Sequence, residues 1–179
     1  MIMKKLFSIL FMTTFLFAAC EGDQGPQGPP GPPGENGVDI VGISYEYDVE
    51  FQYVEDDNIY FSLLEFPTTE KPSDAILVYR LETIEGVETW NLIPKSYFFN
   101  EGILQISSNH TDQDVELLIE ADFDLENLDA SFTSNQYYRV VVVPSDFEQS
   151  TGVDTSDINA VMNALDLKES DVKKVGSLK

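Results

Sequence analysis

The stretch ISYEYDVEFQY, residues 43–53, alternates apolar and polar side chains without interruption. A strand places successive side chains on opposite faces of a sheet, so this period of two predicts a strand with one face in a core and the other in water. The buried face is expected to carry Ile43, Tyr45, Tyr47, Val49, Phe51 and Tyr53. The folded part of the chain therefore begins as a β structure.

Seven further β-rich runs follow, at 59–66, 75–81, 87–93, 97–99, 103–106, 115–119 and 137–143. Residues 55–58, 82–86 and 100–102 carry turn chemistry, which predicts three hairpins. The run 137–143 is apolar throughout and is expected in the centre of a sheet. About eight short strands predict an antiparallel β-sandwich of the Ig-like or Greek-key type over residues 42–148, with a barrel as the alternative.

Residues 149–179 are expected to form a short helix and a tail. Asp154 can cap the helix, and Asp157 suits the positive end of the helix dipole. The apolar stripe that would dock on the sheet consists of Ile158, Val161, Met162 and Leu165. The polar segment 168–179 is expected to be a frayed tail.

Residues 1–19 have the pattern of a signal peptide, with Lys4 and Lys5 before an apolar run that is too short to span a bilayer. The end of this segment, residues 16–20, resembles the lipobox of bacterial lipoproteins. That resemblance implies cleavage before Cys20 and lipidation of its sulfur. The alternatives are an ordinary signal peptide followed by an incidental cysteine, or an uncleaved anchor. Two or more acyl chains hold a protein stably on a membrane. We therefore expect a lipid-anchored protein of the cell outer membrane, either periplasmic or surface-exposed.

Glycine recurs at every third position from residue 22 to residue 37, within the segment 20–41. This strict G-X-Y period predicts a collagen-like stalk, because only glycine fits at the axis of three wound polyproline chains. One interpretation is a monomeric spacer about 55 Å long, at about 3.1 Å per residue. The other is a homotrimer, which needs association of the folded domains as well because six triplets are a marginal triple helix.

These features together resemble a family of uncharacterised, collagen-like lipoproteins of Flavobacteria-type bacteria. The resemblance rests on Cys20, on the Gly-Pro-Pro triplets and on the runs 87–94, 138–144 and 157–162. It implies no known activity. A dihydrolipoamide dehydrogenase label attached to some members does not suit this chain, which has neither a Gly-x-Gly-x-x-Gly motif opening a helix nor a cysteine pair.

The charge of the chain excludes one class of function. Its 32 acidic residues face only ten lysines and arginines, and loss of residues 1–19 would bring the formal charge to −24. Nucleic-acid binding is therefore not expected, since it needs a basic surface. The single cysteine also rules out a disulfide within the chain.

Several acidic residues are candidate calcium ligands, because carboxylate oxygens suit hard cations. They are Asp122, Asp124, Glu126 and Asp129, with Asp112 and Asp114 or Asp56 and Asp57 as irregular alternatives. Asn127 and Thr133 stand where an EF-hand loop needs glycine and glutamate, so that loop fails. No metal site is predicted, and solvated acidic loops are the simpler interpretation.

The remaining candidates are His110 and the tyrosines. His110 is the only histidine, and its expected place is a solvated loop, with catalysis as the minor alternative. Tyr45, Tyr47 and Tyr53 could stack on sugars, although such a stripe more often forms a core. We predict no catalytic residue and no cofactor. The expected function is a non-enzymatic binding or structural role at the cell envelope, with an unknown protein or glycan ligand. The alternatives are a carboxylate-dependent hydrolase and a calcium-dependent adhesion or carbohydrate-binding module.

Overall fold

The computed structural model describes residues 42–176. The predicted signal peptide, the lipidation site Cys20 and the collagen-like repeat lie outside the described residues. Among residues 42–176, no helix combines the length and the apolar character needed to cross a membrane.

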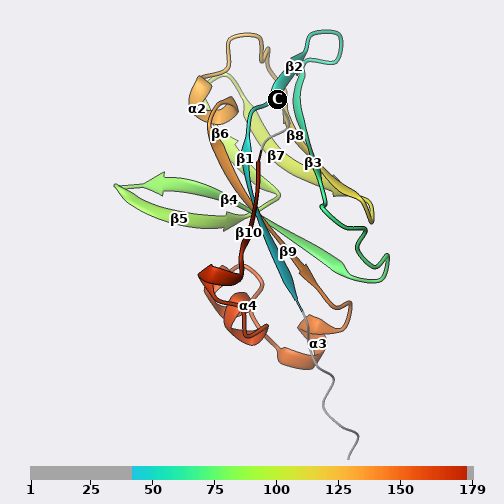
Figure 1. The fold of residues 1–179 in the computed structure, drawn as a ribbon. Helices are drawn as coiled ribbons and strands as arrows, with labels where there is room; N and C mark the ends of the chain where they lie inside the picture. Colours follow the sequence, from blue (N-terminus) through green and yellow to red (C-terminus); the bar gives the residue numbers. More distant parts are fainter. Residues whose placement is uncertain (1–41, 177–179) are drawn as a thin grey trace, which may run out of the picture. The chain divides into compact units, whose positions relative to one another are not determined.

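The described residues are mainly β and form two five-stranded sheets (Figure 1). The first sheet has the order β10 (Lys173–Val175), β1 (Ile43–Val49), β9 (Gln136–Val143), β4 (Ala75–Ile84) and β5 (Val87–Leu92). The second has the order β2 (Gln52–Val54), β3 (Ile59–Glu65), β8 (Asp114–Ala121), β7 (Ile103–His110) and β6 (Lys95–Phe98). The prediction of a mainly β fold is confirmed. The first sheet is mixed rather than antiparallel, because β10 runs parallel to β1.

The two sheets share one hydrophobic core, to which each contributes alternate side chains. Tyr45 and Val140 come from the first sheet, and Leu104, Leu117 and Ile119 come from the second, all fully buried. Strand β9 lies in the middle of its sheet, as its apolar run predicts. Its even-numbered valines face the shared core and its odd-numbered valines lie under the helices, so both of its faces are dry.

The prediction of one continuous strand over residues 43–53 is wrong, because the chain leaves the first sheet after Val49. The Phe51 N–H donates to the Thr133 carbonyl at 2.9 Å, and the Glu50 carboxylate accepts from the Asn135 N–H at 2.8 Å. Residues 52–54 then pair with β3 in the second sheet. The alternation hides this crossing, since Val49 and Phe51 both face the same shared core.

The predicted turn 82–86 is also too long. Strands β4 and β5 continue to Ile84 and from Val87, and only Glu85 and Gly86 form the turn, with φ values of 51° and 82°. Two positive φ angles define the tight hairpin turn whose twist matches that of the strands. Because β4 pairs with β9 only as far as Arg80, residues 81–90 project from the sheet as a two-stranded ribbon (Figure 1). We call residues 81–90 the arm.

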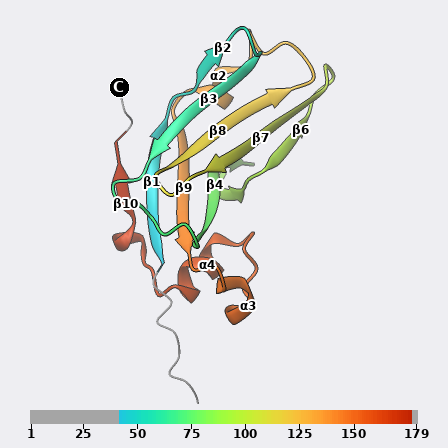
Figure 2. The same ribbon diagram turned by 90° about the vertical axis from the view of Figure 1, so that its right-hand side faces the viewer.

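The predicted C-terminal helix is present as α4 (Ile158–Ala164), and its apolar stripe docks on the first sheet. Its N-cap is Asp157, which accepts from two backbone N–H groups, whereas Asp154 closes the preceding turn at Ser156. Two shorter helices were not predicted, namely α2 (Ala130–Thr133) and α3 (Phe147–Thr151). Helices α3 and α4 lie together at one end of the first sheet (Figure 2).

The expectation of a frayed tail is wrong for residues 168–176. A 3₁₀ turn, Glu169–Asp171, leads into β10, which pairs with β1 beside Tyr45. The cause is Arg139, which is buried on the outer face of the first sheet and needs counter-charges. Its guanidinium donates to Glu46 at 2.5 Å and to Glu169 at 2.7 Å, and lies 4.5 Å from the Trp90 ring centroid.

Replacing this buried arginine should cost far more stability than replacing an exposed cation that pairs with the same carboxylate. Arg139→Met leaves Glu46 buried without its main partner, so we expect a loss of about 3–5 kcal/mol in the free energy of unfolding. Lys174→Met removes an exposed pair to Glu46 of 3.2 Å, and should cost less than about 1 kcal/mol. Urea unfolding of both variants measures the difference. Equal losses of stability in the two variants would contradict the conclusion that Arg139 holds residues 168–176 in place.

Candidate functional site

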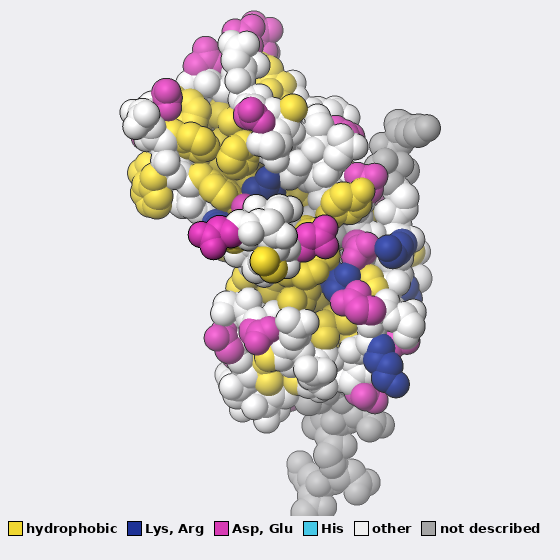
Figure 3. All heavy atoms as spheres, turned by 90° about the vertical axis from the view of Figure 1, so that its left-hand side faces the viewer, with side chains coloured by type: hydrophobic (Ala, Val, Ile, Leu, Met, Phe, Trp, Pro, Cys, Tyr) yellow, Lys and Arg dark blue, Asp and Glu magenta, His cyan; other side chains and the backbone are white. Residues whose placement is uncertain are grey.

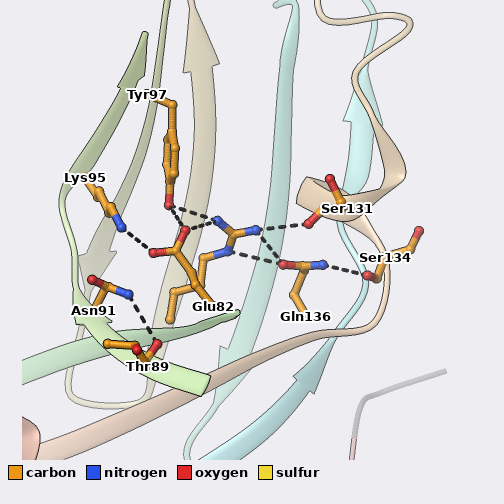
Figure 4. Close-up of polar contacts among 9 residues, drawn as sticks. Glu82, Thr89, Asn91, Lys95, Tyr97, Ser131, Ser134 and Gln136 are labelled. Carbon is orange, nitrogen blue, oxygen red and sulfur yellow. Dashed lines mark hydrogen bonds and ion pairs between the residues drawn. The ribbon is translucent and has the colours of Figure 1, made fainter. Parts of the chain in front are cut away.

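A buried ionic network lies at the base of the arm (Figure 4). Its centre is Arg80, whose side chain is only 5% exposed. The guanidinium makes five hydrogen bonds, to the Gln136 side chain at 3.2 and 2.7 Å, the Ser131 carbonyl at 3.1 Å, Glu82 at 3.1 Å and the Tyr97 hydroxyl at 2.9 Å. Five N–H donors are all that an arginine has. This guanidinium therefore has no donor left for a substrate anion.

Glu82 connects the arm to the second sheet. It accepts hydrogen bonds from Arg80, from the Tyr97 hydroxyl at 2.6 Å and from the Lys95 ammonium. Burial opposes its ionisation, but the hydrogen bonds from Lys95 and Tyr97 outweigh burial and hold the pKa of Glu82 below its usual value. Burial and the bond to Glu82 raise the pKa of Tyr97. Glu82 is therefore held as a carboxylate and Tyr97 as a neutral phenol. This arrangement stabilises the fold and is poorly suited to general acid catalysis, which needs a pKa near the working pH.

The arm presents apolar side chains on the face that carries this network. Ile84 and Val87 are directly opposite each other, two positions beyond Glu82, so they share its face. Their exposed fractions are 47% and 64%. Covering this exposed hydrophobic pair with another surface would remove apolar area from water and so favour the contact. An exposed apolar pair of this kind is typical of a binding surface.

A second apolar surface lies on the β6–β7 hairpin and the loops beside it. We call it the aromatic patch, and it consists of Phe99, Phe123 and Phe132. Phe98 and Ile103 form an exposed cross-strand pair on the opposite face of this hairpin, because the adjacent pair, Tyr97 and Leu104, faces the core. The Phe99 ring packs edge-on against Phe123 at 5.9 Å and against Phe132 at 5.8 Å. Figure 3 shows hydrophobic side chains gathered on this face above the projecting arm.

A groove of about 750 Å³ opens at the other edge of the first sheet, between β1 and β3. We call it the edge groove. Its floor is apolar and consists of the buried residues Tyr47, Val49, Leu64 and Phe66. Three exposed carboxylates line its rim, those of Asp48, Glu50 and Glu65. The volume is within the range of pockets that bind ligands.

The predicted calcium candidates serve as turn and cap residues. The carboxylate of Asp122 accepts from the Ile103 N–H at 2.7 Å, that of Asp124 from the Glu126 N–H at 2.9 Å, and Asp129 caps α2. Asp122, Asp124 and Glu126 line one shallow hollow with Glu55, and Asp129 is not among its lining residues. Across residues 42–176, no three His, Cys, Asp or Glu side chains converge as metal ligands.

His110 is the last residue of β7 rather than a loop residue, and its side chain is exposed. It lines a cavity of about 370 Å³ together with Glu70 and Asp112. Asp114 accepts from the Thr111 hydroxyl at 2.7 Å, which closes the β7–β8 turn. Asp56 and Asp57 are exposed in the β2–β3 turn.

The tyrosine stripe is core, which was the simpler of its two interpretations. Tyr45 and Tyr47 are 0% and 3% exposed, so neither ring is open to a sugar. Burial, the hydrogen bond to Glu70 and the charge of that carboxylate raise the pKa of Tyr45. Tyr53 is half-buried and packs on Tyr60 with ring centroids 4.9 Å apart.

The sequence predicted the hairpin that forms the arm but not its projection from the sheet, and it did not indicate the network, the aromatic patch or the edge groove. One signal was present for the arm, since Glu85-Gly86 between β-rich runs is a two-residue hairpin turn. Comparison with protein-family models, curated proteins and solved structures finds no match.

The low pKa of Glu82 makes the network sensitive to acid. A carboxylate whose folded-state pKa lies below its unfolded value stabilises the fold above the unfolded value of about 4.5, and this contribution is lost as the pH falls through the folded pKa. Glu82→Gln should lower the free energy of unfolding by about 2 kcal/mol at pH 7, since bonds to charged groups contribute about 1.5–3 kcal/mol. The deficit should shrink below pH 4.5.

Urea unfolding of the wild type and Glu82→Gln at pH 7 and pH 3 measures this effect. The matched control is Glu88→Gln, an exposed carboxylate on the other face of the arm, which should change stability by less than about 0.5 kcal/mol. A deficit of the same size at both pH values would show that the charge of Glu82 does not stabilise the network.

Proposed function

We propose that this chain is a non-enzymatic lipoprotein of the outer membrane, periplasmic or surface-exposed, that displays an acidic β domain on a collagen-like stalk. The observation that carries the binding role is the pair of apolar surfaces on one face, the arm tip and the aromatic patch. The collagen-like lipoproteins of Flavobacteria-type bacteria are the family to which we assign it. For the fold we propose an Ig-like or Greek-key sandwich, which two sheets around one core support.

The anchoring part of the proposal rests on the sequence. Cys20 follows a short apolar segment directly and is the only cysteine of the chain, so its sulfur is available for acylation and has no disulfide partner within the chain. The glycine period from 22 to 37 begins two residues later. Export, anchoring and spacing thus account for the segment before the β domain.

The lack of enzymatic activity is supported by how the buried charges are used. Arg80 and Glu82 satisfy each other and their neighbours, and Arg139 is held between Glu46 and Glu169. A catalytic group needs capacity left for the reacting atoms. Arg80 uses all five of its donors within the fold, and both terminal nitrogens of Arg139 are taken by carboxylates of the chain itself.

The stalk suggests which protein covers the apolar face. A G-X-Y repeat wound as a triple helix brings three chains together, and the folded domains that follow it are then held at high local concentration. We propose a homotrimer in which the arm of one copy packs on the apolar face of its neighbour. Ile84, Val87 and Phe99 are the exposed side chains that this contact would bury.

A charge at the arm tip should break this trimer. The chain from residue 21 to residue 179 should have a trimer mass by light scattering, and Val87→Glu should convert it to a monomer because the new charge would be buried. The control is Thr83→Glu, which adds the same charge to the other face of the arm and should stay trimeric. A monomeric wild type would refute the trimer, and a trimeric Val87→Glu would refute the role of the arm.

Labelling with palmitate tests the anchor separately. In the native host, the wild type should incorporate the label and fractionate with the outer membrane. Cys20→Ala should incorporate none and become soluble after cleavage of its leader. Recovery of unlabelled wild type in the soluble fraction would contradict the lipoprotein assignment.

A further inference from the structure

The edge groove exists because the chain changes sheets after Val49. Strand β2 has only three residues, and its first residue, Gln52, pairs with Phe61 of β3. Residues 62–65 of β3 pair with β8 on one side, and the other side has no strand in the described part of the chain. The space that a longer β2 would fill is the groove.

The backbone of β3 is turned so that it can pair with another strand there. The Tyr47 hydroxyl donates to the Glu65 carbonyl at 3.0 Å from the groove side, and the Phe66 N–H donates to Gln113 on the β8 side at 2.8 Å. Successive residues of a strand direct their N–H and C=O groups to opposite edges. Leu63, two residues before Glu65, therefore directs its backbone N–H and C=O into the groove.

The side chains around this edge define the chemistry of an occupant. The floor is buried and apolar, with Val49 and Phe66 among its residues, so it accepts an apolar side chain. The rim carries the carboxylates of Asp48, Glu50 and Glu65, and among residues 42–176 no lysine, arginine or histidine lines the groove. Glu50 also accepts from the Asn135 N–H, so Asp48 and Glu65 are the carboxylates that we assign to a cationic occupant.

We propose that the edge groove binds an extended peptide segment of a partner protein, in which lysines or arginines alternate with apolar residues. The segment pairs with β3 at Leu63 as an added strand. Its apolar side chains enter the floor, and its cationic side chains meet Asp48 and Glu65. Main-chain hydrogen bonds supply affinity in this mode, and alternate side chains supply specificity.

Three observations favour a peptide over a small molecule. The groove is bounded by a strand edge that has no partner strand among residues 42–176, its floor is apolar, and carboxylates from both β1 and β3 line it. An exposed strand edge is a ready template for another strand. The carboxylates select a cationic partner and repel a second copy of this acidic chain.

The test uses a fluorescein-labelled hexapeptide of alternating lysine and valine, measured by fluorescence anisotropy with the chain from residue 21 to residue 179. Two further probes carry N-methyl groups on all valines or on all lysines. The three probes have equal charge, but an added strand turns only one set of amides toward β3. One methylated probe should lose at least tenfold in affinity and the other should bind as the unmodified peptide does. Equal binding by all three probes, or equal loss in both methylated ones, would overturn the proposal.

Variants of the chain locate the contact. Leu63→Pro removes the N–H that faces the groove and should weaken binding at least tenfold, while an edge position tolerates proline. The double variant Asp48→Asn with Glu65→Gln should weaken binding about fivefold to tenfold. Glu88→Gln with Glu101→Gln makes the same change in net charge away from the groove and should leave binding unaltered. Equal weakening in both double variants would assign the binding to net charge and contradict the proposal.

Two more measurements separate this inference from the function proposed above. Val87→Glu alters the arm, at the opposite edge of the first sheet, so peptide affinity should not change. A chain that ends at Gly176 should bind the peptide with the affinity of the full chain. If the peptide bound only after residues 177–179 were removed, the groove would belong to the chain's own end and the proposal would fail.

Discussion

The hydrogen bond from the Phe51 N–H to the Thr133 carbonyl fixes the point at which the chain passes from one sheet to the other. Phe51 enters the shared core at this point, with its ring edge-on to Tyr138 at a centroid distance of 6.0 Å. The Glu50 carboxylate holds the same segment through Asn135. This is the first of the chain's crossings between the two sheets, and it places Phe51 in the core that both sheets share. It also leaves β3 without a full-length neighbour, and the edge groove results.

Two buried arginines on neighbouring strands hold two further parts of the fold, the arm and the end of the chain. Arg80 on β4 faces the second sheet, and Arg139 on β9 lies on the opposite face. A buried guanidinium is costly unless its charge and its N–H groups are matched. All five N–H groups of Arg80 are matched, among others by Glu82 and Gln136 at the base of the arm. The charge of Arg139 is matched by Glu46 and by Glu169 near the end of the chain, although its buried Nε–H has no hydrogen-bond partner. The arm and β10 thus depend on desolvated charge as well as on apolar packing.

The sequence predicts the parts of the fold that depend on neighbouring residues. The alternation of 43–53 identifies Tyr45 and Tyr47 as core, and the apolar run 137–143 identifies the central strand. The sequence does not predict the crossing after Val49, because side chains go on alternating between the core and the solvent when the chain changes sheets. It also misses β10, since the polar segment around Lys173 is held by a buried arginine 34 residues earlier in a strand.

The candidate surfaces are harder to predict for the same physical reason. Glu82 and Lys95 look like ordinary surface charges in the sequence, and only the fold brings them to one arginine. Val87 and Phe98 look like ordinary strand residues, and they are exposed because the arm projects beyond β9 and β6 is an edge strand. Exposure at an edge is a property of strand order, which local periodicity does not contain.

The large acidic excess decides which surfaces of this domain can associate at all. Copies of this acidic chain repel each other over about a Debye length, roughly 8 Å at physiological salt. Contact between copies therefore requires an apolar surface, which the arm tip and the aromatic patch provide, whereas the carboxylate rim of the edge groove attracts only a cationic partner. Salt screens both effects, so it should strengthen the first kind of contact and weaken the second. The two surfaces lie at opposite edges of the first sheet, and a trimer formed through one leaves the other open to a different protein.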